Sequence, residues 1–310
     1  MCFERTLYAL LVLLLVCHQG WAQEQCFADG TAEEEEECDS TSPGRSHLTP
    51  HDDPEPVPDT GVPTEETAAR DCVEVYERGS VTNGVYVIKP LSYPGDPFPV
   101  YCDMENKNGG WTTVQRRQDG TVDFNRTWEE YQLGFGDLEG EFWLGLDKLH
   151  ALTSVGKYIL HLDFTDWEGG RAFTEYSSFR VGGEKEDYTL HLSGYFTGST
   201  GGDAMLRPVS LSGKKFSTRD RDNDECGCNC PEKFEGGDCR WDNDECGCNC
   251  AEKFGGGGWW YWRCGDSYLN GKYHNSHKCE TKQGIVWGPW KQSFKHSLKA
   301  VSMKIRLIDL

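Results

Sequence analysis

The sequence predicts a domain that combines a β-sheet with a few short helices and is cross-linked by disulfides. Several segments alternate apolar and polar residues, which is typical of strands with one buried face. Two short segments carry helix-capping signals. Of the 15 cysteines, Cys2 and Cys17 lie in an apolar N-terminal segment, and the remaining 13 indicate cross-links formed in an oxidising compartment. Because 13 is odd, at least one thiol is free, paired with another chain or bound to a metal.

Residues 1–22 form a predicted signal peptide. Arg5 supplies a positive charge, the run from Leu7 to Cys17 is apolar, and small residues precede a cleavage site after Ala22. The run is shorter than the roughly 20 residues of a membrane-spanning helix, and no second run of that kind follows. We therefore expect a secreted, extracellular protein without a membrane span.

The charge of the chain limits its partners. The formal net charge is -20 at pH 7, and a surface this acidic repels the phosphates of nucleic acids. Cations and basic partners fit that sign better. No Ser, His and Asp constellation has an order or spacing that suggests catalysis, so the sequence is interpreted as that of a non-enzymatic protein.

Residues 23–70 are acidic and rich in proline, and are predicted to be disordered because they have almost nothing to bury. Glycine does not recur at every third position, and no heptads are present, which excludes a collagen stalk and a coiled coil. Cys26 and Cys38 are the cysteines of this segment. They form one local disulfide or they bridge protomers, in which case the protein is a disulfide-linked homo-oligomer.

The folded part is predicted to extend over residues 71–310. A β-rich segment is expected to begin with Val73 and Val75 and to continue at 85–88, followed by a turn at 93–96 and a strand at 111–117. Cys72 and Cys102 bracket this small unit and are expected to form a disulfide.

The middle of the chain predicts two short helices, at 127–131 and 144–152, and strands at 158–164, 173–181 and 188–195. A last strand at 300–307 has the alternation needed to return to the central sheet. His161 and His191 lie within these strands and are interpreted as structural histidines with satisfied hydrogen bonds. Asn125 begins a glycosylation sequon, Asn125-Arg126-Thr127, which requires an exposed position.

An acidic cysteine loop occurs twice in tandem: residues 222–230 are repeated as residues 242–250. Its alternating aspartates supply the hard oxygen ligands that calcium prefers. Three thiols in five residues leave zinc as an alternative. The surrounding stretch, residues 216–284, has little periodic apolar pattern, so we expect cross-links and ions to hold it more than a core does.

Segments along the folded part resemble the fibrinogen-related domain shared by fibrinogen chains, ficolins, tachylectins, microfibril-associated glycoproteins and angiopoietins. The resemblance covers roughly residues 71–310, and it implies an α+β fold. That fold has a small disulfide-closed N-terminal subdomain, a central sheet with flanking helices, and a loop-rich C-terminal subdomain that binds calcium and ligand. The segments are Asn83-Gly84-Val85-Tyr86, Cys102-Asp103-Met104, Gly109-Gly110-Trp111-Thr112, Trp128-Glu129-Glu130-Tyr131, Phe142-Trp143-Leu144-Gly145, Phe216-Ser217-Thr218, Trp259-Trp260-Tyr261, Leu269-Asn270-Gly271 and Met303-Lys304-Ile305-Arg306.

The resemblance implies calcium as the cofactor, bound by two aspartates spaced i, i+2 and by two backbone carbonyls before an Asn-Cys pair. The second copy is favoured because Cys250 and Cys264 have nearly the disulfide spacing of the family. Three alternatives stay open: the first copy binds, both copies bind, or one copy is idle or an error of gene prediction. The implied ligands are Asp242, Asp244 and the carbonyls of Cys246 and Cys248 in the second copy, or Asp222, Asp224 and the carbonyls of Cys226 and Cys228 in the first.

In the lectin members of this family an acetyl group enters a pocket beside the calcium site. Gly265 stands here where a histidine is usual, and Thr281-Lys282 replaces a Tyr-Ala pair. Arg263-Cys264 is the position of a cis peptide in those lectins. The residues that correspond to the pocket are Phe254, Tyr261, Arg263, Cys264, Gly265, Thr281 and Lys282.

Two functions follow from the resemblance. The first hypothesis is a calcium-dependent lectin of innate defence that binds acetylated or other surface glycans on cells or microbes. The alternative is an extracellular-matrix or receptor-binding ligand, of the microfibril-associated or angiopoietin kind, because Cys264-Gly265 is similar to angiopoietins. Trp259, Trp260 and Trp262 are interpreted as the small core of the C-terminal subdomain, with a sugar- or partner-binding platform as the other hypothesis.

Overall fold

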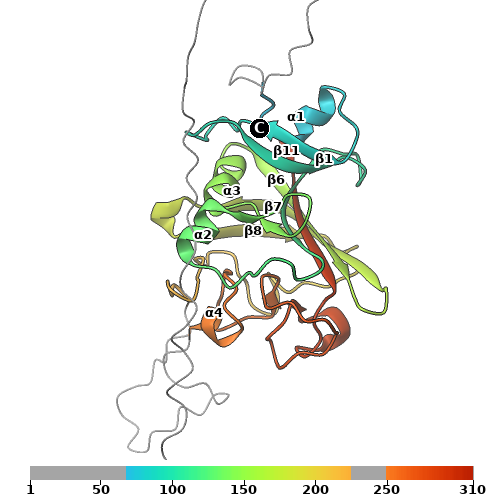
Figure 1. Cartoon of the computed structure of the whole chain (residues 1–310), viewed down its shortest axis with the longest axis vertical. Helices are drawn as coiled ribbons and strands as arrows, with labels where there is room; N and C mark the ends of the chain where they lie inside the picture. Colours follow the sequence, from blue (N-terminus) through green and yellow to red (C-terminus); the bar gives the residue numbers. More distant parts are fainter. Residues whose placement is uncertain (1–67, 225–248, 310) are drawn as a thin grey trace, which may run out of the picture. The chain divides into compact units, whose positions relative to one another are not determined.

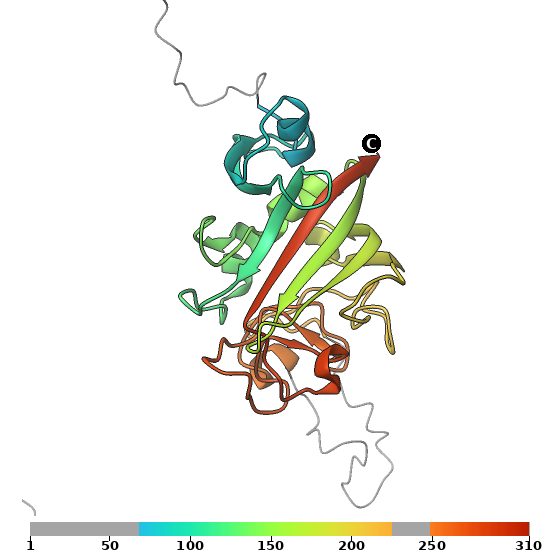
Figure 2. The same cartoon turned by 90° about the vertical axis from the view of Figure 1, so that its right-hand side faces the viewer.

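The strand that comes last in the chain lies in the middle of the main sheet. The computed structural model describes residues 68–224 and 249–309. The predicted signal peptide, residues 23–67 of the acidic segment with Cys26 and Cys38, and residues 225–248 lie outside the described residues. The predicted disorder was wrong for residues 68–70, because Ala69 is buried and forms a parallel bridge with Ile88. Figure 2 shows β11 crossing the molecule between its two neighbours, β3 and β6.

The main sheet has the strand order β1-β2-β3-β11-β6-β7-β8, with β5 paired to β3 and β4 paired to β5. All of these pairs are antiparallel. The strands are β1 (Gly84–Ile88), β2 (Phe98–Asp103), β3 (Trp111–Arg117), β4 (Phe135–Gly136), β5 (Phe142–Trp143), β6 (Lys157–Thr165), β7 (Arg171–Val181), β8 (Leu190–Tyr195) and β11 (Ala300–Asp309). The predicted strands at 85–88, 111–117, 158–164 and 173–181 and the final strand are therefore confirmed.

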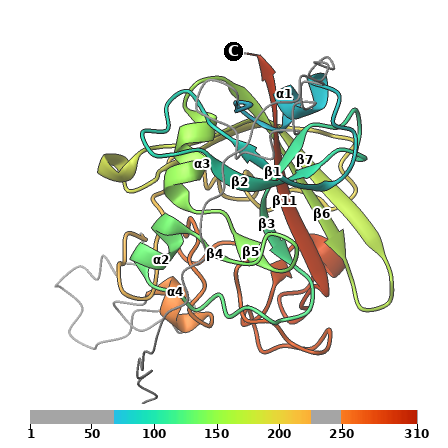
Figure 3. The same ribbon diagram turned by 45° about the horizontal axis from the view of Figure 1, so that its top comes forward.

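The short elements flank this sheet (Figure 1). Helices α2 and α3 lie to one side of the sheet (Figure 3). Among the described residues no helix is long and apolar enough to span a bilayer. The remaining elements are α1 (Cys72–Glu77), α2 (Trp128–Leu133), α3 (Leu146–Thr153), η1 (Glu184–Glu186), α4 (Cys250–Lys253), β9 (Ser267–Tyr268), β10 (Val286–Trp287) and η2 (Trp290–Gln292).

Helix α1 corrects one expectation, because Val73 and Val75 lie in this helix and not in a strand. The Asp71 carboxylate caps the helix by accepting the N–H of Glu74 at 2.9 Å. Cys72 on the same helix is bonded to Cys102 of β2 with an S–S distance of 1.98 Å. The cap and the cross-link outweigh the modest strand preference of the two valines.

Helix α2 begins as its sequence predicts. The Thr127 hydroxyl accepts the Glu130 N–H, while the Glu130 carboxylate accepts the Thr127 N–H at 2.8 Å, which together form a capping box. Helix α3 is joined to β7 by Thr153, whose hydroxyl accepts the Val181 N–H at 3.0 Å. Both predicted helices are present, with boundaries shifted by one or two residues.

The C-terminal subdomain, defined here as residues 249–299, has an aromatic core. Trp259 and Trp260 are 1% and 0% exposed, and Tyr268 and Trp287 are equally buried. The expectation that cross-links and ions hold this part of the chain more than a core was therefore wrong for its described residues. Aromatic side chains far apart in the sequence pack together here without helical or strand periodicity, so no periodic pattern marks them. Trp262 is only partly buried.

The two strand histidines differ. His161 is 2% exposed, and its ring nitrogens lie 3.1 Å from Glu175 Oε2 and 3.1 Å from Asp163 Oδ1, so its structural interpretation is confirmed. For His191 that interpretation was wrong, because its Nε2 is buried and has no hydrogen-bond partner.

Candidate functional site

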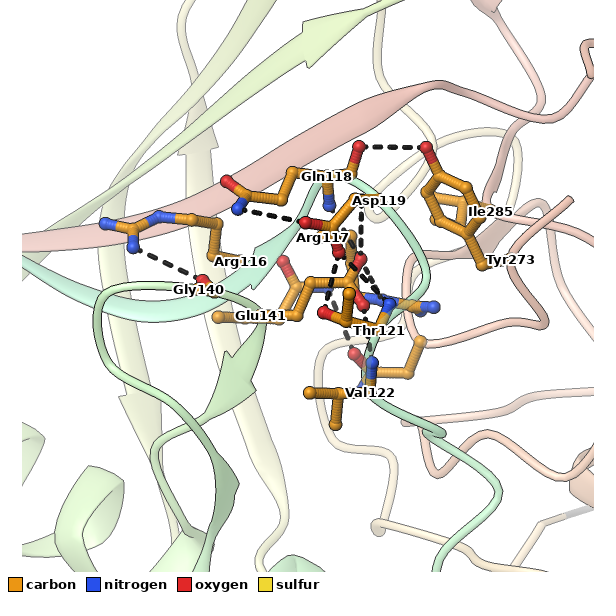
Figure 4. Close-up of polar contacts among 12 residues, drawn as sticks. Arg116, Arg117, Gln118, Asp119, Thr121, Val122, Gly140, Glu141, Tyr273 and Ile285 are labelled. Atoms are coloured by element: carbon orange, nitrogen blue, oxygen red, sulfur yellow. Dashed lines mark hydrogen bonds and ion pairs between the residues drawn. The ribbon is translucent and has the colours of Figure 1, made fainter. Parts of the chain in front are cut away.

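The C-terminal subdomain is attached to the main sheet through a buried arginine (Figure 4). Arg117 of β3 is 1% exposed and donates to the carbonyl of Gly271 at 2.8 Å and to that of Leu269 at 3.3 Å. Its Nε lies 3.7 Å from Oε1 of Glu141, which is fully buried. Burial lowers the pKa of Arg117 to about 10, and the charge of Glu141 opposes that shift, so the guanidinium stays protonated at neutral pH.

Glu141 also fixes the loop that follows β3. Its carboxylate accepts the N–H groups of Gln118 at 2.7 Å, Asp119 at 3.1 Å and Val122 at 3.1 Å. The Tyr273 hydroxyl of the C-terminal subdomain donates to the Gln118 carbonyl at 2.8 Å. Figure 4 shows these contacts converging on Glu141 and Gln118. The C-terminal subdomain is therefore held to the sheet by a network of polar contacts.

The structure brings residues of both loop copies together. The Asp224 carboxylate of the first copy accepts the N–H of Cys250, in the second copy, at 2.8 Å. The Asn249 side chain donates to the carbonyl of Thr218 at 3.2 Å. Asp222 accepts the N–H of Asp224 at 3.0 Å, which turns the backbone between the two aspartates. The start of the first copy and the end of the second copy thus form one continuous surface.

Only part of the implied calcium loop falls within the described chain. The carboxylates of Asp222 and Asp224 are present with the i, i+2 spacing of oxygen ligands, and Asp222 is exposed to solvent. These oxygen donors fit calcium better than they fit a soft metal. The other implied ligands, Cys226, Cys228, Asp242, Asp244, Cys246 and Cys248, lie outside the described residues.

A disulfide closes the loop after α4. Cys250 and Cys264 are bonded with an S–S distance of 2.04 Å, which is the pair that the resemblance implies. Arg263 and Cys264 have φ values of +42° and +56°, and Gly265 has +28°. Among the described residues the cis peptide bond is Arg207-Pro208, so the Arg263-Cys264 peptide is trans. Non-glycine residues seldom adopt a positive φ, and such positions often mark functional loops.

Lys282 fills the aromatic pocket that its sequence position predicts. Its ammonium lies 5.9 Å from the ring centre of Phe254, 5.7 Å from that of Tyr268 and 4.9 Å from that of Phe294. It also donates to the carbonyl of Gly265 at 2.8 Å. Cation–π contacts and a charge-assisted hydrogen bond therefore keep a charged group against the rings that would line an acetyl pocket.

The remaining residues of the predicted pocket differ in exposure. Tyr261 is 3% exposed and its hydroxyl donates to a backbone carbonyl, so it belongs to the core of the subdomain. Thr281 and Arg263 are exposed. Among the described cysteines Cys279 has a free thiol, and burial raises its pKa, which lowers its reactivity at neutral pH. Asn125 is exposed, as glycosylation requires, and its modification stays a prediction.

Sequence reasoning missed two rings of this pocket, Tyr268 and Phe294. Both lie in the loop-rich stretch where no strand or helix period marks an inward-facing position. The available signal was the pairing of aromatic residues with Lys282, since a lysine in place of an apolar residue requires something to hold its charge.

The chain matches the model of the family described as fibrinogen beta and gamma chains, C-terminal globular domain. The match falls into two parts, residues 68–241 and 238–308. The two parts overlap at residues 238–241, immediately before the second copy of the loop. The tandem copy is therefore the place where this chain departs from the common pattern of that domain.

Several proteins are similar to this chain. Human angiopoietin-2 is 40% identical over 79% of this chain, and human angiopoietin-1 is 39% identical over 79%; each match covers 44% of the relative. The chain thus spans about half the length of the curated relatives it matches. Among solved structures, the fibrinogen-like globe domain of human ANGPTL2 is 37% identical, with a TM-score of 0.65, covering 77% of this chain and 99% of that one.

A further similar structure is lamprey fibrin D-dimer complexed with the peptide ligand Gly-His-Arg-Pro-amide. It is 36% identical, with a TM-score of 0.64, and the match covers 76% of this chain and 73% of that chain. These relatives and solved structures each match about three-quarters or more of this chain.

Proposed function

Because this chain belongs to the family of fibrinogen C-terminal globular domains, we propose that it is a secreted, non-enzymatic binding protein whose C-terminal loops recognise a protein ligand. The loops concerned are 250–265, closed by the Cys250–Cys264 disulfide, and 281–282. This is the receptor- or matrix-binding alternative of the sequence analysis. The similarity to two angiopoietins over 79% of this chain supports it.

The observation that carries the proposal is the position of Lys282. An acetyl group binds through its methyl and carbonyl, and it needs an apolar wall that is free to receive it. Here the rings of Phe254 and Tyr268 are covered by the Lys282 ammonium, which the Gly265 carbonyl holds at 2.8 Å. Displacing that ammonium forfeits contacts worth about 0.5–1 kcal/mol per ring at exposed sites. An acetylated glycan would therefore lack its main contact surface.

The surface around this pocket suits a peptide chain. Arg263 is exposed on a backbone with positive φ, and its guanidinium lies 4.9 Å from the ring centre of Trp262. A rigid loop that presents an arginine and a partly buried tryptophan has the residue types that dominate protein interfaces. A related solved structure, the lamprey fibrin D-dimer, is complexed with a peptide ligand, which supports the same class of partner.

We also propose calcium as the cofactor of these loops, held in part by Asp222 and Asp224. The carboxylate of Asp224 is tied to the N–H of Cys250, at the start of the disulfide-closed loop. Bound calcium would neutralise the two carboxylates and fix the loop end beside that disulfide. Calcium would act on partner binding by ordering the loops, because no atom of Lys282 or Gly265 is among the implied calcium ligands.

The test is binding of the fluorescently labelled full-length protein to intact cells. We expect the signal to fall when the cells are treated with trypsin and to persist after treatment with glycosidases. Arg263→Glu should lower the affinity at least roughly tenfold. Arg171→Glu, at the start of β7, is the matched control with the same charge change and should bind like the wild type.

A glycan array with and without a chelator tests the competing hypothesis of a calcium-dependent lectin. We expect no calcium-dependent binding to acetylated sugars by the wild-type protein. Saturable binding to such sugars, or cell binding that disappears only with glycosidase, would overturn the proposal.

A further inference from the structure

Three basic side chains stand side by side on neighbouring strands of the main sheet. Arg180 of β7 and His191 of β8 are directly paired across the sheet. Tyr158 is paired with Phe179, which places Lys157 of β6 beside Arg180. Residues opposite one another in an antiparallel pair share a face. Lys157, Arg180 and His191 therefore form a row, called here the basic row, across three strands.

The basic row lines a surface hollow of about 390 Å³. Ser178 adds a hydroxyl group to the same lining, and no carboxylate is among the described side chains that line the hollow. Its apolar walls include Val155 and Phe179. The hollow is thus large enough for a small polar group or one sugar ring, and its polar lining is basic.

This arrangement works against the stability of the free protein. Like charges directly opposite on neighbouring strands repel one another. Among the described side chains, which do not include that of Asp309 opposite Lys157 on β11, Lys157 and Arg180 have no ion pair with a carboxylate. The buried Nε2 of His191 has no hydrogen-bond partner. The chain as a whole carries a net charge of -20, so carboxylates are abundant. Two basic side chains and an imidazole without a carboxylate partner among the described side chains point to an anion from outside.

We propose that the basic row binds a tetrahedral oxyanion, the chemistry that a sulfated sugar and a phosphate ester share. The planar guanidinium of Arg180 can donate two parallel hydrogen bonds to such a group. The imidazole of His191 belongs to the same lining and adds a titratable group beside the oxyanion. Lys157 adds a mobile ammonium at the exposed edge of the hollow, and Ser178 a neutral donor.

The hollow is in contact with the buried part of loop 250–265, because the ring of Phe179 in its lining lies 6.4 Å from that of Trp260. Arg263 and Lys282 are not among the residues that line it. Strand β11 begins at Ala300 and ends at Asp309, which is the Cα partner of Lys157, so the basic row lies where β11 ends (Figure 2). An oxyanion at the basic row would therefore not contact Arg263 or Lys282. This second surface does not depend on the protein-binding function proposed above, and either can fail without the other.

His191 makes the affinity for the oxyanion depend on pH. Burial, and next the charge of Arg180, lower its pKa below the ordinary value, while Glu186 of η1 opposes that shift. The free ring is therefore neutral at pH 7. A bound oxyanion raises the pKa of His191 again, so binding takes up a proton and strengthens as the pH falls toward 6.

The experiment measures binding of the full-length protein to four probes by calorimetry, at pH 6.0 and pH 7.5. The probes are a sulfated disaccharide, the same disaccharide without sulfate, a sugar phosphate, and inorganic sulfate. We expect saturable binding of an ester probe, no binding of the unsulfated sugar, and tighter binding at pH 6.0. The relative affinities for the sulfate and phosphate esters identify the source of the oxyanion.

Two variants complete the test. Arg180→Gln should weaken binding roughly tenfold or more, because it removes a charge-assisted pair of hydrogen bonds. Arg171→Gln, near the other end of the same strand, removes the same charge and should leave binding unchanged. Without an oxyanion, Arg180→Gln should melt no lower than the wild type, since repulsion is relieved, so misfolding cannot mimic the loss. Equal binding by both variants, or absence of saturable binding by every oxyanion probe, would overturn the proposal.

Discussion

The carboxylate of Asp224 accepts a hydrogen bond from the backbone N–H of Cys250, 2.8 Å away and 26 positions later in the chain. This bond joins the first copy of the acidic loop to the last residue of the second copy. Since residues 222–230 and 242–250 are identical, deleting residues 222–241 or residues 231–250 leaves the same sequence. Asp224 would then face the Cys that follows it by six positions.

The first prediction is that one copy is dispensable for folding. Deletion of residues 231–250 should yield a chain that folds and keeps a disulfide from Cys230 to Cys264. Shortening the loop between Asp224 and its partner lowers the entropy cost of closure, so the free energy of unfolding should rise by about 1 kcal/mol. Urea denaturation of the deletion variant beside the full-length protein measures the difference. A variant that fails to fold would show that the second copy has a structural role.

The second prediction concerns the calcium ligands. Asp222→Asn together with Asp224→Asn should lower calcium affinity at least roughly tenfold, because two carboxylate charges are lost from the ligand set. Asparagine still accepts the N–H of Cys250, so the loop geometry is kept. The matched pair, Asp242→Asn with Asp244→Asn, should have the smaller effect. If calorimetry shows the larger loss of calcium affinity in the Asp242→Asn and Asp244→Asn pair, the site belongs to the second copy, the one favoured by disulfide spacing.

The third prediction tests the buried charge beneath the C-terminal loops. Glu141→Gln leaves the Arg117 guanidinium, 1% exposed, without its counter-charge. The free energy of unfolding should fall by about 3–5 kcal/mol, as when one partner of a buried pair is removed. Glu139→Gln, an exposed position in the same turn, should change it by less than about 0.5 kcal/mol. Similar losses in both variants would show that Glu141 is not coupled to Arg117.

The fourth prediction is a loss of stability in acid. Burial opposes ionisation of Asp163, but hydrogen bonds from His161 and Lys304 and the charge of Lys304 hold its pKa below the ordinary value. The Lys304 ammonium lies 2.8 Å from Asp163 and 2.6 Å from Asp103. A lowered folded-state pKa contributes stability above the unfolded pKa of about 4, and this contribution is lost as the pH falls below it.

Thermal melting between pH 6 and pH 2 checks this fourth prediction. Lys304→Met should melt lower at pH 6 and show a shallower further loss in acid than the wild type. Lys185→Met, on the exposed turn η1, is the control and should keep the wild-type slope. An unchanged slope in Lys304→Met would show that the Asp163 carboxylate gains nothing from this lysine.

The sequence predicted β6 and β7 well because residues in these strands largely alternate between a buried and a less buried face. Strand β3 is buried almost throughout, and its β-branched and aromatic residues predicted it. It failed at α1, where a capping aspartate and a disulfide decide the structure of a segment with two valines. It also failed at His191, because a strand pattern tells which face a side chain occupies but not whether its polar atoms find partners. Lys157 and Arg180 lie more than 20 positions apart, so only the strand register brings them together.

The residues of the pocket were predicted one by one from their correspondence to the family. That the Lys282 ammonium lies against the rings of the pocket was not predicted. Phe254 and Lys282 were both named, yet nothing in their spacing places an ammonium over a ring. Tyr268 and Phe294 complete the pocket from loops without a repeating pattern. Long-range contacts among irregular segments depend on the whole fold, so the periodicity of the sequence does not predict them.

The central position of β11 has a consequence for how the protein is made. Strands β3 and β6 each pair with β11 and not with each other, so the strand pairing that joins the two halves of the sheet runs through residues 300–309. During synthesis, both halves leave the ribosome before the strand that joins them exists. Met303 pairs with Gln115, a contact between distant parts of the chain, which slows folding. A premature stop shortly before residue 300 should thus leave two exposed sheet edges and a chain prone to aggregation.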